Sequence, residues 1–361
     1  MEDRSRRTRT SARRGFSPRL LLTLLAAPLA VFLFIFALRL LVAGATTLTD
    51  LLDALNAGGM LNLIGLGWIG SYLVLSGSPI AATALTLLDT GVLTQTEAFA
   101  QIVGSRLGAS FVVLAVGFLY YLRGQRLPDS VHVGVVAFLV TVTTWIPVAL
   151  LGAAALHWGW FDGIAIGAIE PLATLNNDVY GPPINDLRDA LPDALIFVAG
   201  LALLLGAFKL FDSILPTPER TSDYIARLPA IVHTRWAMFA LGAAVTLVTF
   251  SVAVSLTLLV PLSLRGAIRR DAIVAYVLGA NVTTFADTLF AASALESGAT
   301  GTVVVTTIFL ALAVAFVVLT VLYRPYLAAI HWAARRITRD RRGLTWFIAA
   351  IVALPVVLTL A

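Results

Sequence analysis

The chain has 361 residues, of which 59% are hydrophobic and 12% are charged, and its net charge is +5. Soluble domains are about a quarter charged, so this composition excludes an ordinary soluble protein and predicts an all-α polytopic membrane protein with recurring apolar runs of about 20 residues. The basic residues gather in a few segments between the apolar runs, which excludes a continuous nucleic-acid-binding face. The absence of cysteine excludes disulfides and thiolate metal sites.

The chain begins with a basic tail, residues 1–19, which holds seven arginines and two acidic residues. Such a tail stays on the cytoplasmic side and fixes the orientation of the helix that follows. We expect residues 20–44 to form the first transmembrane helix, because the run is too long for the core of a signal peptide. The protein is therefore predicted to be a multi-pass protein of the cell membrane, with its N-terminus in the cytoplasm and residues 45–60 outside.

The apolar runs of residues 61–75 and 80–88 are too short to cross a membrane. The longer one would span about 22 Å at about 1.5 Å per residue, against a hydrocarbon core of about 30 Å. Because a Ser-Gly-Ser-Pro sequence separates them, we predict a re-entrant hairpin with its tip at membrane depth. A crossing at residues 98–122 follows, with a second break at residues 104–110, and completes a first repeat that covers residues 60–122.

Connecting helices are expected in residues 123–234. Two apolar runs, residues 131–156 and 194–215, are long enough to cross the membrane. The segment between them, residues 157–193, holds six acidic residues and one arginine. We therefore place this segment outside the cell, since basic residues favour the cytoplasmic side.

The last third of the chain repeats the hairpin and adds two helices. A second repeat, residues 235–297, has a hairpin made of residues 236–250 and 254–264, followed by a crossing at 272–295 that is broken at 280–284. The C-terminal residues 298–361 are expected to form two crossings, residues 302–323 and 344–361, on either side of a basic loop at residues 324–342. This gives seven crossings and two hairpins, with the C-terminus outside.

The two repeats correspond position by position. Ser76, Gly91 and Gly104 each lie 175 residues before a counterpart in the second copy, namely Ser251, Gly266 and Gly279. The basic segments place the first copy running from outside to inside and the second from inside to outside. Inverted-topology repeats built from broken helices are typical of secondary transporters, because they make one midplane site reachable from both sides in turn.

The breaks carry the polar groups that are available for chemistry. Helix N-termini at a break attract anions, whereas freed carbonyls and hydroxyls suit small hard cations. The polar break residues are Ser76, Ser78, Ser105, Ser110, Thr249, Ser251, Ser255, Asn281, Thr283 and Thr284. This set suits an oxyanion together with a cation. The alternative is that small residues here only let helices pack closely.

Two segments carry a resemblance to a known family. The second copy contains Gly279-Ala-Asn-Val-Thr-Thr284, and the first copy contains Gly104-Ser-Arg-Leu-Gly-Ala-Ser110 at the same place. Together with the serines at the hairpin tips and their spacing, these motifs resemble the repeat domain of the sodium–phosphate cotransporters. The resemblance covers about residues 60–122 and 235–297. It implies a secondary carrier that holds phosphate at the two hairpin tips and binds sodium through tip and break residues.

The resemblance, together with the charges at Arg106 and Asp287, suggests roles for single residues. The expected substrate-binding residues are Ser76, Ser78, Arg106, Ser251 and Ser255. The expected cation-binding residues are Ser105, Ser110, Thr249, Asn281, Thr283, Thr284 and Asp287. The glutamine that precedes the family's serines falls on Leu75 and Phe250, and the asparagine of the first copy is Arg106. The coupling ion is therefore left open between sodium and protons.

Arg106 and Asp287 are charges within apolar spans. Such residues are costly in a membrane and usually face a partner or a cavity. In one interpretation Arg106 replaces a sodium ion as the fixed positive charge that faces an anion, with Asp287 as its partner or as a proton carrier. In the other, the two residues form a structural pair that locks the repeats together in a protein that does not transport.

The leading function is secondary active transport of a small inorganic anion, foremost phosphate coupled to sodium, by alternating access. The alternatives are a proton-coupled or uncoupled anion carrier, and a non-transporting scaffold or regulatory subunit. A polar cavity at the predicted substrate residues would favour a carrier, and a dry, packed interface would favour the scaffold. No catalytic motif is present and no cofactor is expected, so an enzyme is disfavoured. The expected partners are the lipid bilayer, the anion, and sodium or protons, and the oligomeric state stays open.

Overall fold

The computed structural model describes residues 18–54, 58–122, 127–162, 176–214, 234–264 and 268–361, and all regular elements in these ranges are helical. Seven of the described helical segments are long and apolar enough to cross a membrane: Leu25–Gly44, Gln95–Leu119, Val131–His157, Asp193–Ile214, Arg270–Ala294, Gly298–Thr338 and Arg341–Thr359. They coincide with the seven crossings expected from the sequence. The all-helical class of a polytopic membrane protein is confirmed, while most of the basic tail lies outside the described residues.

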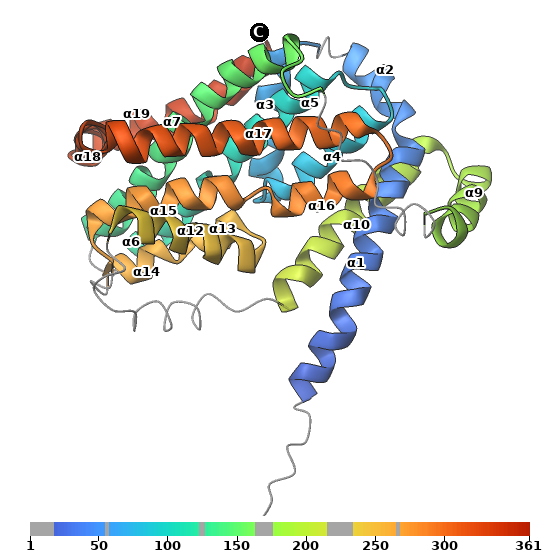
Figure 1. The fold of residues 1–361 in the computed structure, drawn as a ribbon, viewed down its shortest axis with the longest axis horizontal. Helices are drawn as coiled ribbons and strands as arrows, with labels where there is room; N and C mark the ends of the chain where they lie inside the picture. The colour runs from blue at the N-terminus through green and yellow to red at the C-terminus, as the bar shows by residue number, and fades with distance from the viewer. Residues whose placement is uncertain (1–17, 55–57, 123–126, 163–175, 215–233, 265–267) are drawn as a thin grey trace, which may run out of the picture.

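Two long helices form an arm beside the main body (Figure 1). They are α1, Pro18–Gly44, and α10, Asp193–Ile214. The two helices pack closely against each other, because Gly44 of α1 lies against the backbone of Asp193 and Phe197 of α10. Three short elements lie at the end of this arm: α2, Thr46–Ala54; the π-helical turn η1, Asn176–Tyr180; and α9, Gly181–Ala190.

The main body contains both predicted repeats. The first copy comprises α3, Met60–Val74; α4, Ser78–Asp89; α5, Gln95–Ala109; and α6, Phe111–Leu122. The second comprises α12, Arg235–Thr249; α13, Val252–Thr257; α14, Leu259–Leu264; α15, Arg270–Thr283; and α16, Ala286–Ala294. The remaining helices are α7, Leu127–His157; α17, Gly298–Val317; the π-helical turn η3, Val318–Leu322; α18, Tyr323–Thr338; and α19, Arg341–Thr359.

The first helices of the two copies have matching ends. Residues 60 and 74 bound α3 and residues 235 and 249 bound α12, so both ends differ by 175 residues. Each helix is followed by a residue in the left-handed region, Leu75 with φ 57° and Phe250 with φ 48°. These two are the only non-glycine residues with positive φ in the described part of the chain. Because bulky residues rarely adopt this conformation, the same unusual turn ends the same helix twice.

Helix crossings within each copy also match. In the first copy α3 crosses α5, and in the second α12 crosses α15, at glycines that touch backbone carbonyl oxygens of the facing helix. The four contacts are Gly67 with Gln101, Gly104 with Ile64, Gly242 with Tyr276, and Gly279 with Phe239. A Cβ atom at any of these glycines would collide with the carbonyl group, so close approach of the two backbones requires glycine there.

The two predicted breaks in the crossing helices are present but are much shorter than expected. The predicted break at residues 104–110 is helical as far as Ala109, and that at 280–284 is helical as far as Thr283. The non-helical residues are only Ser110, and Thr284 with Phe285. The physical reason is that a glycine inside a helix lowers stability by only about 1 kcal/mol, which does not break the helix. Gly104 and Gly279 stay helical and allow two helices to cross closely.

The basic loop expected at residues 324–342 is mostly a helix. Residues 298–338 form one helical segment through α17, η3 and α18. Pro325 does not interrupt it because it lies in the first turn of α18, where no backbone N–H donor is needed. Only Arg339 and Asp340 separate α18 from α19.

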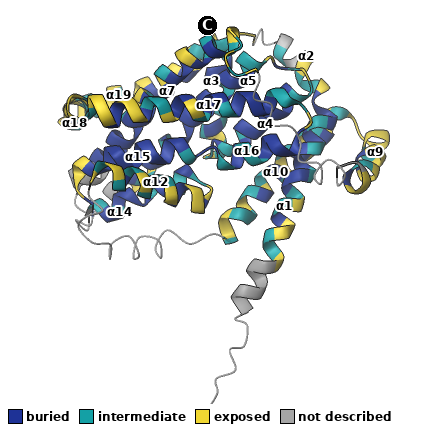
Figure 2. Cartoon of the chain, in the orientation of Figure 1, coloured by how far each residue is buried: buried dark blue, intermediate teal, exposed yellow. Residues whose placement is uncertain are grey.

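Burial separates a core from a periphery (Figure 2). Helices α15, α16 and α17 are mostly buried, whereas α9 and α19 are largely exposed. The exposed side chains of α19 include Trp346, Val352 and Val357, as expected of a helix that faces lipid. The residues with buried charge lie in the core, where the two copies meet.

Candidate functional site

An arginine from the first copy and an aspartate from the second meet in the core. Arg106 lies in the last turn of α5, and Asp287 lies in the first turn of α16. Each position suits the charge, because the C-terminal end of a helix favours cations and the N-terminal end favours anions. The side chains are 1% and 4% exposed, and Arg106 Nη2 lies 3.9 Å from Asp287 Oδ1.

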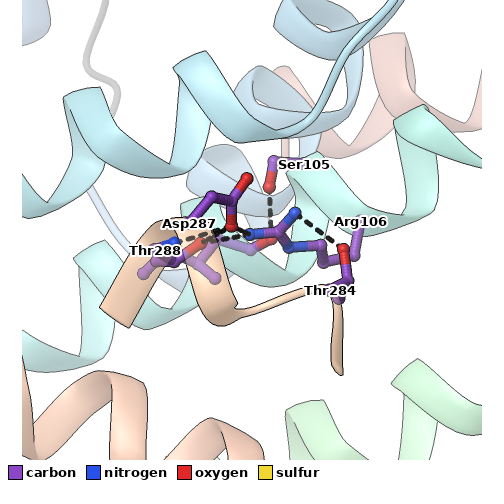
Figure 3. Close-up of polar contacts among 6 residues, drawn as sticks. Ser105, Arg106, Thr284, Asp287 and Thr288 are labelled. Carbon is purple, nitrogen blue, oxygen red and sulfur yellow. Dashed lines mark hydrogen bonds and ion pairs between the residues drawn. The ribbon is translucent and has the colours of Figure 1, made fainter. Parts of the chain in front are cut away.

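Two threonines complete this contact (Figure 3). Arg106 Nη1 donates to Thr284 Oγ1 at 3.2 Å, and Nη2 donates to Thr288 Oγ1 at 2.5 Å. Thr288 donates in turn to Asp287 Oδ1, from its backbone N–H at 2.6 Å and from its hydroxyl at 2.9 Å. Because the direct distance between the charges is long for a hydrogen bond, the Thr288 hydroxyl is the main link. We call Arg106, Thr284, Asp287 and Thr288 the Arg–Asp network.

The aromatic ring of Phe285 covers one face of the arginine. Its centroid lies 4.5 Å from Arg106 Cζ, which is within the range of a cation–π contact. Phe285 itself is fully buried and packs edge-on against Trp145 of α7. The guanidinium is thereby held between the break residues Thr284 and Phe285 and Thr288 of α16.

The Arg–Asp network leaves two polar atoms without a partner. Arg106 Nε and Asp287 Oδ2 are both buried and neither has a hydrogen-bond partner. An unsatisfied buried polar group costs about 1–3 kcal/mol, and more when it is charged. One donor and one acceptor of the pair are therefore open to interaction with another group.

A small cavity lies beside Arg106 at the meeting point of both copies. Its lining comprises Arg106, Ser110, Thr141, Val252, Leu256, Asn281 and Thr284, and its space is too small to admit a water molecule. Asn281 interacts weakly with Thr141 of α7, with Asn281 Nδ2 donating to Thr141 Oγ1 at 3.4 Å. In this conformation the interface between the copies is dry and closed.

Most of the other predicted hydroxyls bond to helix backbone. They do so in four cases: Ser105 with Ile102 O at 2.7 Å, Ser110 with Leu107 O at 2.7 Å, Thr249 with Val245 O at 2.8 Å, and Thr283 with Ala243 O at 2.9 Å. Ser255 pairs with the Tyr276 hydroxyl at 3.0 Å. These groups do not converge on one point in the described conformation.

The hairpin tips approach Arg106 without placing their serines in the small cavity, since Gly77 packs against the carbonyl group of Ser105. Ser251 is the N-cap of α13, where its Oγ accepts from Val254 N at 3.2 Å. Neither Ser251 nor Ser76 nor Ser78 lines the small cavity. Of the twelve predicted site residues, the structure thus brings together Arg106, Ser110, Asn281, Thr284 and Asp287.

No family model, no curated protein and no solved structure matches the chain. The resemblance to the sodium–phosphate cotransporters therefore stays a prediction that depends on the residues that carry it.

Sequence reasoning missed three residues of the site. Thr288 lies four residues after Thr284, about one helical turn further along the chain, so both side chains point the same way and reach the same guanidinium group. Phe285 was hidden because an aromatic residue in an apolar run carries no signal. Thr141 stands in a run with Thr143 and Thr144, and this polar patch within an expected crossing was the available signal.

A second polar cluster lies apart from this site. The rings of His132 and His331 are stacked, with centroids 6.0 Å apart and an interplanar angle of 6°. His331 Nε2 lies 3.4 Å from Asp271 Oδ1. The two histidines are far apart in the sequence, so only the packing of α18 against α7 brings them together. No group of three or more His, Cys, Asp or Glu side chains within the described ranges is arranged to hold a metal ion.

Proposed function

We propose that this protein is a secondary carrier of a small inorganic anion, with phosphate as the first candidate, that works by alternating access in the cell membrane. The observation that carries the proposal is the Arg–Asp network. It joins the end of α5 in one copy to the start of α16 in the other, at the points where both helices break. Buried charges in membrane spans usually mark a substrate or proton pathway.

The relation between the copies supports alternating access. The matching helix ends, left-handed residues and glycine crossings indicate one structural unit used twice. In Figure 1 the path from α5 to α6 and the path from α15 to α16 run in opposite directions across the molecule. An inverted-topology pair of this kind lets one central site open to either side by the same motion.

Arg106 is the residue that would bind the anion. A guanidinium matches the oxygen atoms of phosphate with paired donors, and its charge is permanent. In the closed conformation Asp287 and Thr288 take up this positive charge. An incoming anion competes with Asp287 for the guanidinium, and protonation of Asp287 weakens the competitor. A proton bound to Asp287 and an anion bound to Arg106 then cross the membrane together.

Protons are favoured over sodium as the coupling ion. The four hydroxyls expected to bind sodium, those of Ser105, Ser110, Thr249 and Thr283, bond to separate backbone carbonyl groups and do not converge on one point. Of the three other expected ligands, Thr284 and Asp287 contact Arg106, and Asn281 pairs with Thr141. A sodium ion beside a guanidinium would be repelled by it. The coupling role that the resemblance gives to sodium is therefore proposed to belong to Asp287.

A second candidate is a non-transporting scaffold on the same fold. The dry cavity beside Arg106, which has no room for water, favours it. In that case the Arg–Asp network serves only to lock the two copies together, as buried ion pairs do in some proteins. The carrier proposal requires that this cavity opens to admit the anion. A measurement of transport therefore distinguishes the carrier from the scaffold.

The deciding experiment is uptake of radiolabelled phosphate by proteoliposomes that contain the full-length protein. Three arms are needed: an inward sodium gradient, an equal potassium gradient, and an imposed pH gradient. We expect uptake in the pH-gradient arm and its loss in Arg106→Ala. The matched control is Arg188→Ala, because Arg188 is an exposed arginine on α9, far from the Arg–Asp network in the fold.

The other results have definite meanings. Uptake that needs sodium and persists without a pH gradient would overturn proton coupling while keeping the carrier. Absence of uptake in all arms, from protein with a cooperative unfolding transition, would overturn phosphate transport and favour the scaffold. Full uptake by Arg106→Ala would remove the anion-binding role of Arg106.

A further inference from the structure

The helical segment of residues 298–338 is too long for a single membrane crossing. As a straight helix its 41 residues would extend about 60 Å at about 1.5 Å per residue, about twice the thickness of the hydrocarbon core. The segment bends instead. The π-helical turn η3 follows α17, Leu322 departs from helical geometry with φ −102° and ψ 5°, and Pro325 lies in the first turn of α18. A π-helical turn and a proline are both common causes of a helix kink.

Helix α18 turns away from the direction of α17. In Figure 1, α17 is seen from the side, whereas α18 is seen nearly end-on. The 20 residues of α17 extend about 30 Å, which is enough to cross the hydrocarbon core. Helix α18 therefore begins where the crossing is complete, and its change of direction places it along the membrane surface.

Helix α18 has a buried face and an exposed face. Ile330 and Ala334 are buried, and α18 packs against α7. The exposed face carries Trp332, Arg335 and Arg336. A surface that combines tryptophan with arginine is typical of a segment at the boundary between membrane and water.

Exposed arginines gather where α18 meets α19. We call this cluster the basic corner, and its members are Arg335, Arg336, Arg339, Arg341 and Arg342. The one acidic residue in residues 335–342 is Asp340, so five arginines and one aspartate give these eight residues a net charge of +4. Asp340 is engaged as the N-cap of α19, where its Oδ1 accepts from Gly343 N.

The protein itself neutralises the basic corner only weakly. Within the part of the chain that the structure describes, none of the five arginines forms an ion pair. Arg341 and Arg342 lie in the first turn of α19, where the positive end of the helix dipole disfavours cations. Like charges at such short separations also repel one another. An anion from outside the protein would relieve this repulsion.

The surroundings of the basic corner indicate the kind of anion. Trp332 precedes Arg335 by three residues and Trp346 follows Arg342 by four, and their side chains are exposed by 66% and 75%. Tryptophan is enriched at the level of lipid headgroups. Helix α19 continues with exposed apolar residues such as Val352. A soluble phosphate ester matches the arginines alone, whereas a phospholipid matches the arginines, the tryptophans and the apolar surface together.

We propose that the basic corner binds the headgroup of an anionic phospholipid, whose acyl chains lie along the exposed apolar surface of α19. The guanidinium groups donate paired hydrogen bonds to the phosphate oxygens, and clustered arginines beside a membrane span are typical of anionic-lipid recognition. In the topology expected from the sequence, the basic corner faces the cytoplasmic leaflet. The inference concerns lipid binding only, so it does not depend on the proposed transport.

The test is equilibrium binding of tritiated dioleoylphosphatidylglycerol to the immobilised full-length protein in detergent micelles. The competitors are unlabelled dioleoylphosphatidylglycerol, dioleoylphosphatidylcholine and glycerol 3-phosphate. The two lipids have the same acyl chains and differ in headgroup charge, and glycerol 3-phosphate is a soluble phosphate ester without acyl chains. We expect saturable binding that phosphatidylglycerol displaces at least about tenfold better than phosphatidylcholine does, because several arginines contribute. Glycerol 3-phosphate at the same concentration should displace none.

Arginine variants locate the binding site. Arg336→Gln is expected to weaken binding about fivefold. The triple variant Arg335→Gln, Arg336→Gln and Arg339→Gln should weaken it further, and lysine at the same three positions should retain more binding than glutamine. The matched control is Arg324→Gln, which removes an exposed arginine from the same helix. Arg324 lies about 18 Å from Arg336 along the helix axis at about 1.5 Å per residue, beyond the range of screened charges, so this variant should bind like the wild type.

Each of four results would overturn the proposal. Equal displacement by the two lipids would indicate an unselective lipid shell, and displacement by glycerol 3-phosphate would indicate a site for soluble phosphate esters. Equal losses in Arg336→Gln and Arg324→Gln would indicate a diffuse positive field without a site. Absence of saturable binding to protein with a cooperative unfolding transition would exclude the lipid altogether. If the triple variant does not fold, the two single variants decide the question.

Discussion

At the scale of single residues, a hydroxyl group holds the two charges together. Thr288 accepts from Arg106 and donates to Asp287, so it links two ions whose direct distance is 3.9 Å. A buried ion pair offsets its desolvation only when the surrounding hydrogen bonds are made. The stability of this contact between the copies therefore depends on Thr288 as much as on the charges.

Replacement of Thr288 by valine tests this role. Thr288→Val keeps the shape of the side chain and removes the hydroxyl, so we expect a loss of about 1–3 kcal/mol in the free energy of unfolding. The matched control is Thr306→Val, because Thr306 Oγ1 is buried and has no hydrogen-bond partner. That variant should be neutral or more stable. Both values can be measured by thermal unfolding of the purified protein, and equal effects of the two changes would contradict the role given to Thr288.

The left-handed residues give a second prediction at this scale. Leu75 and Leu73 are both exposed, by 58% and 81%, but Leu75 has a positive φ and Leu73 is inside α3. Leu75→Gly should stabilise the protein by about 1 kcal/mol, because glycine adopts this conformation without strain. Leu73→Gly should destabilise it by about 1 kcal/mol. Unfolding midpoints of the two variants that shift in the same direction would disprove the argument.

At the scale of helices, glycine positions the repeated crossings. Gly67 and Gly242 occupy equivalent sites, and each touches the carbonyl group of the facing helix. Backbones that approach this closely gain van der Waals contact, which is a main source of helix association in membranes. The pairs α3 with α5 and α12 with α15 are therefore expected to behave as tightly packed units.

Alanine substitutions at glycines test the crossings. Gly67→Ala and Gly242→Ala should each destabilise the protein by about 1–3 kcal/mol or more, because the added methyl group overpacks a backbone contact. Gly206→Ala is the control: Gly206 lies inside α10, and an added Cβ would meet nothing within 4 Å. Alanine there should raise stability by about 0.5–1 kcal/mol. Equal stabilisation by Gly67→Ala and Gly206→Ala would show that helix propensity, and not packing, governs these positions.

At the scale of the whole molecule, the proposed topology is inverted between the copies. Gln95 and Arg270 begin the equivalent helices α5 and α15. In an inverted arrangement these equivalent residues lie on opposite sides of the membrane, with Gln95 outside and Arg270 inside. A parallel repeat would place them on the same side.

Cysteine labelling measures this directly, since the chain has no cysteine of its own. In intact cells, a membrane-impermeant maleimide should label Gln95→Cys and should label Arg270→Cys only after the membrane is opened. Asp186→Cys on α9, in the segment expected outside, is the control for external access. Labelling of both equivalent positions from the same side would exclude the inverted topology, and with it the proposed alternating access.

The class of the protein could be predicted from the sequence alone, and the sequence also suggested the two repeats. Span number follows from the length of apolar runs, which the thickness of the bilayer sets, and the seven expected crossings coincide with the seven apolar helices. The repeat can be recognised because serines and glycines recur at the same spacing in both segments. Arg106 and Asp287 were found because a charge in an apolar run is conspicuous, wherever the chain folds.

Only the tertiary structure decided how these residues interact. Glycines that suggested breaks serve close crossings, because a glycine has the same sequence signal in both uses. Thr288 and Phe285 became part of the site through the approach of α16 to α5. A pocket of about 690 Å³ exists because α1 and α10 pack beside α16. Hydropathy is a local property that depends on each segment alone, whereas these contacts join segments far apart in the chain and depend on which helices pack together.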